Sequence, residues 1–181
     1  MTTIAETANK LGYREYALIP NDGKRHEIID GVHFVIAAPN LYHQAVSKRL
    51  QYLLYTKVEL ADLGTMFNAP CDVQLSDHDI VQPDLLVVLK ARTRIFTPTN
   101  VKGAPDLIVE ILSPSSEDYD RSTKRELYRK RSVQEYWIVD PSEQSVEQLV
   151  LRTDQYLSKI ETVEITCEII PGLSINLRDV W

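Results

Sequence analysis

Three runs of mostly apolar residues, spaced along the middle of the chain, have the pattern of buried strands. They occupy residues 84–89, 106–112 and 135–141. A nearly uniform apolar run, without alternation of polar positions, is typical of a strand that is covered on both faces. The sequence therefore predicts a central sheet with other elements packed on each side.

Two segments with helical spacing accompany these runs. The first covers about residues 41–60 and follows Pro39-Asn40, a pair typical of a helix start. The second, about residues 117–131, is charged and amphipathic and lies between the second and third apolar runs. Buried strands with one helix before them and one between two of them indicate a mixed sheet flanked by helices, of the α/β or α+β class.

Hairpins are predicted toward both ends of the chain. Residues 25–36 hold the pair Asp30-Gly31 between two β-prone runs, which is a strong hairpin signal. Residues 145–181 are expected to form another hairpin and a closing tail. The remaining expectations are a short helix at 4–10, short strands at 65–68 and 71–75, a polar turn at 76–79, and a loop with little regular structure at 92–104.

Length and composition fit a single globular domain spanning residues 1–181. The chain is 44% hydrophobic and 25% charged, which is ordinary for a soluble protein. No run approaches the roughly 20 apolar residues of a membrane span, and the first residues lack a signal-peptide pattern. We therefore expect a cytoplasmic protein without a membrane partner. Cys71 and Cys167 belong to no paired-cysteine motif, which indicates buried thiols.

The balance of charge disfavours a general polyanion binder. The formal net charge is −6 and the isoelectric point is near 5.2, whereas a broad nucleic-acid-binding surface is usually basic. A local basic groove, or a bound divalent cation, would still allow contact with phosphates.

Glu110 is the first candidate for chemistry because it lies in the middle of an apolar run. A buried carboxylate is costly to desolvate unless it has a cation, a donor or a proton. A catalytic role and a buried structural ion pair both remain open at this point.

The residue that would work with Glu110 is one of two aspartates that follow prolines. Asp106 lies four residues away on the same strand, about 13 Å along an extended chain, which is too far for two ligands of one metal ion. Asp84 is adjacent to Glu110 if the two apolar strands pair. The alternative for Asp84 is a turn or cap carboxylate at a strand start.

The predicted helix after the Glu110 strand supplies a cation. Asp120, Lys124 and Tyr128 fall four residues apart and share a face with Leu127. If Leu127 and Tyr128 point inward, Lys124 is carried toward the core and can reach Glu110 with its long stem. The alternative is an ordinary surface pair of Asp120 with Lys124.

Two earlier residues are accessory candidates. Glu27, between apolar neighbours in the first hairpin, is either a further metal ligand or a solvent-facing strand residue. His43, near the start of the first long helix, is a candidate base, phosphate contact or cap.

Together these residues resemble a known family, the Uma-type putative restriction endonucleases, over about residues 13–175. The motifs that carry the resemblance lie in the same order as in that family. They are Glu27-Ile28-Ile29-Asp30-Gly31, His43, Pro83-Asp84-Leu85-Leu86-Val87-Val88, the segment from Gly103 to Ser116, Asp120, Lys124, Tyr128 and Glu135-Tyr136-Trp137-Ile138-Val139-Asp140-Pro141.

The resemblance implies a restriction-endonuclease-like fold of the PD-(D/E)xK superfamily, with a central mixed β-sheet flanked by helices and an N-terminal hairpin. In that superfamily an Asp, a Glu and a Lys gather magnesium. Carried onto this chain, Asp84 and Glu110 are the acids and metal ligands, and the backbone carbonyl of Leu112 completes the shell. Leu112 occupies the usual lysine position, so Lys124 is the implied replacement. Glu27 is implied as a ligand for a second ion.

The expected function is thus a Mg²⁺-dependent endodeoxyribonuclease, with Mn²⁺ as a substitute, DNA as substrate, a homodimeric assembly and no organic cofactor. Clustered carboxylates would repel one another, and a metal ion would remove that conflict. Two alternatives remain. The leucine at position 112 and the acidic composition favour an inactive nuclease-fold binding module, and a nuclease acting on RNA would use the same site.

Overall fold

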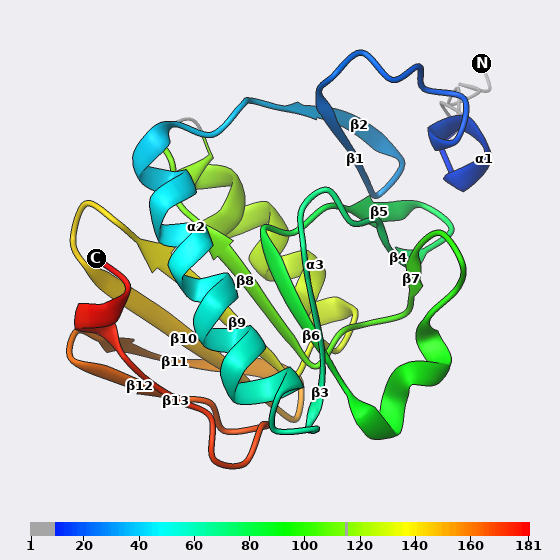
Figure 1. Cartoon of the computed structure of the whole chain (residues 1–181). Helices are drawn as coiled ribbons and strands as arrows, with labels where there is room; N and C mark the ends of the chain where they lie inside the picture. The colour runs from blue at the N-terminus through cyan, green and yellow to red at the C-terminus, as the bar shows by residue number, and fades with distance from the viewer. Residues whose placement is uncertain (1–9, 115) are drawn as a thin grey trace, which may run out of the picture.

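The chain is described from a computed structural model that covers residues 10–114 and 116–181. Its architecture is a mixed α/β fold built on two larger sheets and one small hairpin (Figure 1). The expected helix at 4–10 lies outside the described residues except for Lys10. Among the residues that are described, no helix is both long and apolar enough to cross a membrane.

The larger sheet has six strands and contains all three of the apolar runs. Its two central strands, β8 and β9, are parallel, and its other neighbours are antiparallel. In spatial order the strands are β11 (Gln155–Glu161), β10 (Ser145–Arg152), β9 (Glu135–Asp140), β8 (Leu107–Ile111), β6 (Leu85–Leu89) and β3 (Gly64–Asn68).

The second sheet has five strands and lies beside the first in Figure 1. It contains the predicted N-terminal hairpin, in which Asp30 and Gly31 make the turn with positive φ angles of 51° and 78°. In spatial order the strands are β2 (Val32–Ile36), β1 (Arg25–Ile29), β5 (Asp79–Val81), β4 (Val73–Ser76) and β7 (Val101–Lys102). A separate hairpin pairs β12 (Glu164–Thr166) with β13 (Ser174–Asn176).

The helical segments are short except for one. Asn40 caps this longest helix, α2, by accepting a hydrogen bond from the backbone N–H of His43 at 2.8 Å. In chain order the segments are α1 (Tyr13–Tyr16), α2 (Leu41–Leu54), the π-helical η1 (Tyr55–Glu59), the 3₁₀-helical η2 (Lys90–Ile95), the π-helical η3 (Tyr119–Lys124), α3 (Arg125–Lys130) and the 3₁₀-helical η4 (Leu177–Asp179).

The six-stranded sheet is buried on both faces, as the apolar runs predict. Alternate residues of a strand point to opposite faces, so Leu85 and Val87 pack with α2 and the C-terminal segment, while Leu86 and Val88 pack with α3. Figure 1 shows α2 lying across one face of this sheet. Glu110, on the strand next to β6, shares the face that α3 covers.

Several expected boundaries differ from the structure. The first predicted helix, 41–60, ends as an α-helix at Leu54 and continues as η1, and the second, 117–131, begins with the π-helical η3. The loop expected at 92–104 contains the end of η2 and also β7, because Val101 is buried and pairs with β4. Strand β5, three residues long, was not predicted because so short a run has no readable period.

Candidate active site at the junction of two strands

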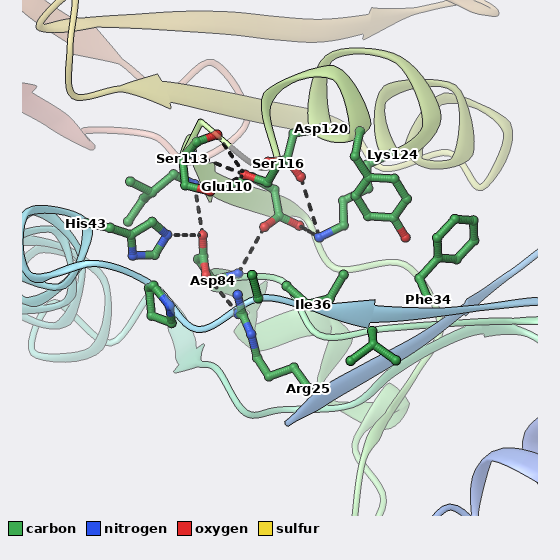
Figure 2. Close-up of a pocket in the computed structure, with 15 residues that line it drawn as sticks. Arg25, Phe34, Ile36, His43, Asp84, Glu110, Ser113, Ser116, Asp120 and Lys124 are labelled. Carbon is green, nitrogen blue, oxygen red and sulfur yellow. Dashed lines mark hydrogen bonds and ion pairs between the residues drawn. The ribbon is translucent and has the colours of Figure 1, made fainter. Parts of the chain in front are cut away.

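A cavity of about 380 Å³ opens where β6 begins and β8 ends (Figure 2). It lies between the start of α2, the chain that leaves β2, and the helical segment η3. Five of the side chains predicted from the sequence line it, namely His43, Asp84, Glu110, Asp120 and Lys124. The tertiary structure therefore brings together residues that are spread over 82 positions of the chain (43 to 124).

Asp84 and Glu110 meet because their strands pair. Strands β6 and β8 are antiparallel with Leu85 opposite Val109, which places the preceding Asp84 opposite Glu110. The backbone N–H of Asp84 donates to Oε2 of Glu110 at 3.3 Å, and Ile111 N donates to Oδ2 of Asp84 at 2.9 Å. Each carboxylate is thus held by the other residue's strand, as the pairing predicted from the sequence requires.

The Asp84 carboxylate also has two side-chain donors. Nη1 of Arg25 lies 2.9 Å from Oδ1, and Nε2 of His43 lies 3.0 Å from Oδ2. Burial raises the pKa of Asp84, but the hydrogen bond and charge of His43 and the charge of Arg25 outweigh it and lower the pKa to about 2. Asp84 is therefore ionised at neutral pH. Asp84 lies directly before β6 and accepts from the backbone N–H of Ile111, so it has the cap position of the alternative and also lines the cavity.

The Glu110 carboxylate is more deeply buried, with only 2% of the residue exposed. Its Oε1 accepts from Nζ of Lys124 at 2.9 Å and from the hydroxyl of Tyr128 at 2.7 Å. Burial raises the pKa of Glu110 to about 8, and the carboxylates of Asp120 and Asp84 add to the rise, although Lys124 opposes it.

Lys124 is a shared cation for three acids. Its Nζ lies 2.9 Å from Glu110, 3.2 Å from Glu27 and 3.7 Å from Asp120. Burial lowers the pKa of Lys124, but these carboxylates outweigh it and hold the pKa well above the usual value. The side chain is 4% exposed, so the alternative of a surface pair with Asp120 is wrong, and Lys124 stays protonated.

Glu27 lies behind this lysine rather than in the cavity wall. It is fully buried, so the alternative of a solvent-facing residue is wrong. Its Oε1 accepts from the backbone N–H of Gln82 at 2.8 Å, and its Oε2 accepts from the hydroxyl of Tyr119 at 3.1 Å. Glu27 is therefore connected to the cavity through Lys124 and Tyr119.

Two other residues considered from the sequence have different places. Asp106 binds Arg92 at 2.7 Å and the backbone N–H of Leu89 at 2.8 Å, away from the cavity, in agreement with its exclusion. Leu112 does not line the cavity, and its side chain packs in the core with Leu127 and Ile138.

The donor set has the chemistry of a hard divalent cation site. Its acidic lining consists of the carboxylates of Asp84, Glu110 and Asp120, which are ligands that hard divalent cations prefer. With Glu27 behind them, the buried acids outnumber the buried ammonium group of Lys124. Within the described residues, however, no three or more His, Cys, Asp or Glu residues are already arranged around a point that could hold an ion. Each oxygen of Asp84 and Glu110 already accepts a protein hydrogen bond, so a cation would have to displace a donor.

Sequence reasoning missed three residues of the site. Arg25 precedes Glu27 by two positions on β1, and period-two spacing places both on one face. Tyr128 follows Lys124 by four residues on the same helical face and was assigned a packing role only. Tyr119 has its ring 5.4 Å from Nζ of Lys124. The signal for the first two was spacing from a residue already singled out.

Comparison with known proteins agrees with this architecture. A curated relative, an uncharacterised protein of Synechocystis sp. strain PCC 6803, is 32% identical over 126 residues, which are 68% of this chain and 64% of the relative. The matched segment thus spans less than two thirds of that relative's length.

A crystal structure described as a putative nuclease belonging to DUF820, from Anabaena variabilis, superimposes with a TM-score of 0.79 at 19% identity. The match covers 94% of this chain and 97% of the other, so the two share a fold. The model of the Uma2 family, described as "Putative restriction endonuclease", matches residues 13–178. The chain therefore belongs to the Uma2 family of putative restriction endonucleases.

Proposed function

We propose that this protein hydrolyses phosphodiester bonds of DNA as an endonuclease that depends on Mg²⁺, with Mn²⁺ as a substitute. The observation that supports the proposal best is the pairing of Asp84 and Glu110 across two strands, in one cavity, with Lys124 bound to Glu110. Membership of a family described as restriction endonucleases agrees with it.

Asp84 and Glu110 are the proposed metal ligands. The family resemblance also implies the backbone carbonyl of Leu112 and the carboxylate of Glu27, but neither residue lines the cavity, so both would have to shift toward it to take part. A divalent cation held by these residues would polarise the phosphate and lower the pKa of a bound water. The pKa of Glu110 is raised mainly by burial and further by the neighbouring carboxylates, and the charge of the ion would counter both effects.

Lys124 has the proposed role of stabilising negative charge on the reacting phosphate. Because its pKa is held well above the usual value, it stays protonated and cannot act as a general base. Arg25 lines the same cavity, so its guanidinium can donate to a phosphate oxygen when the scissile group enters. His43 and Asp120 orient the groups around them, His43 through Asp84 and Asp120 through Lys124.

The direct test is cleavage of supercoiled plasmid DNA with Mg²⁺ or Mn²⁺, and with EDTA as the metal-free control. Glu110→Gln and Lys124→Met are expected to reduce the rate by at least about 100-fold, a loss typical of removing one key electrostatic contact. The matched controls Glu143→Gln and Lys159→Met change exposed residues and should cut like the wild type. Cutting that survives both site variants would refute the assignment.

A second candidate function is binding without catalysis. The specific observation in its favour is that every oxygen of Asp84 and Glu110 already has a protein donor, while the usual lysine position holds Leu112. This reading predicts no Mg²⁺ binding by calorimetry in the wild type or in Asp84→Ala.

An RNA nuclease would instead cleave RNA in preference to DNA of the same sequence under the same conditions.

We propose further that two copies act together, because cutting both strands of a duplex with one site per subunit requires a pair. Light scattering at the protein concentration used for cleavage tests this point. A dimer is expected, and a monomer that makes double-strand breaks would exclude it.

A further inference from the structure

A second hollow, of about 610 Å³, adjoins the candidate active site. It is lined by α2 between His43 and Gln51, by the chain leading into β1, by residues 36–39 between β2 and α2, and by the corner at residues 68–70. Six residues line both hollows, namely Arg25, Ile36, Ala37, Pro39, His43 and Asp84. A molecule bound at Asp84 therefore extends directly into the second hollow.

The two hollows differ in their chemistry. The active-site cavity is lined by three carboxylates, Asp84, Glu110 and Asp120. Each hollow is also lined by two cations, Arg25 and Lys124 in the first and Arg25 and Lys24 in the second, but the second hollow has only one carboxylate, Asp84.

Apart from His43, the remaining polar side chains of the second hollow are uncharged. Helix α2 contributes Gln44, Ser47 and Gln51 at positions i, i+3 and i+7, which form a stripe along one helix face. Asn68 and Asn21 enter from two other segments. Each amide can both donate and accept hydrogen bonds.

Amide side chains match the edges of nucleobases, which also present donors and acceptors side by side. The volume lies in the usual range of about 300–1,000 Å³ for small-molecule pockets, so one nucleotide fits. The chain's net charge of −6 leaves little sequence-independent attraction for a long duplex, because such attraction depends on many phosphate contacts by Lys and Arg. Hydrogen bonds to one base would compensate for this weak electrostatic attraction to the DNA.

We propose that the second hollow binds an unpaired nucleotide of a DNA strand, next to the phosphate held at Asp84 and Glu110. Arg25, which lines both hollows, contacts the phosphate held at Asp84, Lys24 contacts the adjoining phosphate, and the amide stripe of α2 contacts the base. A base must leave the stack to enter such a hollow, and an unpaired base does so at least cost. This inference rests on the proposed nuclease site for its position, but its test requires no cleavage.

The test is fluorescence anisotropy with a short labelled single strand and a hairpin duplex of the same sequence, in EDTA and again with Ca²⁺. We expect the wild type to bind the single strand about tenfold more tightly than the duplex. The double variant Gln44→Leu/Gln51→Leu should weaken single-strand binding about tenfold, the loss expected for one good amide–base contact. Ser47→Phe, which fills the hollow, should do the same.

The control Gln155→Leu makes the same amide-to-leucine change at an exposed position of β11 and should bind like the wild type. Thermal unfolding of each variant checks that the fold is retained. Equal affinity for both DNA forms, or normal binding by the filled and amide-free variants, would overturn the inference.

The outcomes for this inference and for the nuclease proposal are separable. If the wild type cleaves DNA with a metal ion and Ser47→Phe binds the single strand normally, the inference is overturned and the nuclease proposal is supported. Single-strand binding that is weakened by both hollow variants, in a protein that cuts no DNA with any metal, would support the inference and count against the nuclease.

Discussion

Nζ of Lys124 lies 2.9 Å from Oε1 of Glu110, although fourteen residues separate the two in sequence. The lysine comes from the π-helical segment η3 and not from the strand that holds the glutamate. The position two residues after Glu110 holds Leu112, which packs in the core. The pair of a lysine and a glutamate that one strand was expected to supply is therefore formed here by two elements. Strand β8 holds Glu110, and η3 brings Lys124 to it.

Removing this cation should destabilise the protein in a pH-dependent way. Lys124→Met leaves three buried carboxyl groups without their shared partner, and we expect a loss of about 3–5 kcal/mol in the free energy of unfolding at neutral pH. At pH 5 the loss should be smaller, because burial raises the pKa of Glu110 and of Asp120, so these two carboxyl groups can take up protons. Urea unfolding at both pH values measures it, with Lys159→Met as the control. Equal losses at both pH values would contradict the prediction.

Glu110 should make the metal-free protein less stable as the pH rises. Its pKa is raised from an unfolded value of 4.5 to about 8, so the folded state holds the extra proton between these values. The contribution of Glu110 to stability is then fully present below about pH 4.5 and is lost as the pH rises toward 8. Unfolding in EDTA should show this slope in the wild type, and Glu110→Gln should flatten it.

Mg²⁺ should reverse that trend if it binds at Glu110. An ion competes with the proton, so it should raise the melting temperature more at pH 8 than at pH 6. The same comparison on Glu110→Gln is the control and should show little effect of the ion. A Mg²⁺ effect that is independent of pH, or that persists in the variant, would place the ion elsewhere.

Removing Arg25 should change the affinities for Mg²⁺ and for DNA in opposite directions. Its guanidinium occupies Oδ1 of Asp84 at 2.9 Å, so Arg25→Ala removes a competitor and should raise Mg²⁺ affinity several-fold, by about 1 kcal/mol. DNA affinity should fall because a phosphate donor is lost. Calorimetry and anisotropy test the two halves, and Arg25→Lys should restore part of the DNA affinity. Parallel changes in both affinities would refute this role.

Asp79 should be a structural carboxylate outside the site. It accepts from the backbone N–H of Asp30 at 2.8 Å, from Ser76 at 2.6 Å and from Nε of Arg131 at 2.9 Å. Asp79→Ala should lower the free energy of unfolding by about 1–3 kcal/mol, because the donors lose their acceptor.

This stabilisation should depend on pH. Burial raises the pKa of Asp79, but these donors outweigh it and lower the pKa. The stabilisation is thus present above the unfolded pKa of 3.8 and is lost as the pH falls through the lower folded value. Acid titration of wild type and variant, followed by circular dichroism, measures it.

The docking of α2 should depend on its buried stripe. Leu50 is 1% exposed and packs with the six-stranded sheet, so Leu50→Ala should cost about 2–5 kcal/mol. Tyr52, two positions on, is 68% exposed, and Tyr52→Ala should change stability little. Denaturant unfolding compares the two, and similar losses would mean that α2 docks through another face.

Much of the fold could be predicted from the sequence because local patterns of apolar and turn residues specify its main elements. The apolar runs became β6, β8 and β9, and the Asp30-Gly31 pair became the turn between β1 and β2. What failed was short or irregular, such as β5 and β7, whose pairing depends on strands distant in the chain.

The sequence by itself determined which elements form, which of their faces are apolar, and that Glu110 would need a partner, because hydrophobic period and the cost of a buried charge are local properties. Helical spacing also predicted Lys124 as a candidate partner, and the tertiary structure decided that its Nζ lies within hydrogen-bond distance of Glu110. The tertiary structure alone added Tyr128 as a second donor to Glu110 and Arg25 as a donor to Asp84. Arg25, Tyr128 and Lys124 reach the two acids from β1, α3 and η3, and the order of strands in the sheets sets those distances. A buried carboxylate is satisfied by whatever donors the packing of remote elements brings within about 3 Å, which no local pattern specifies.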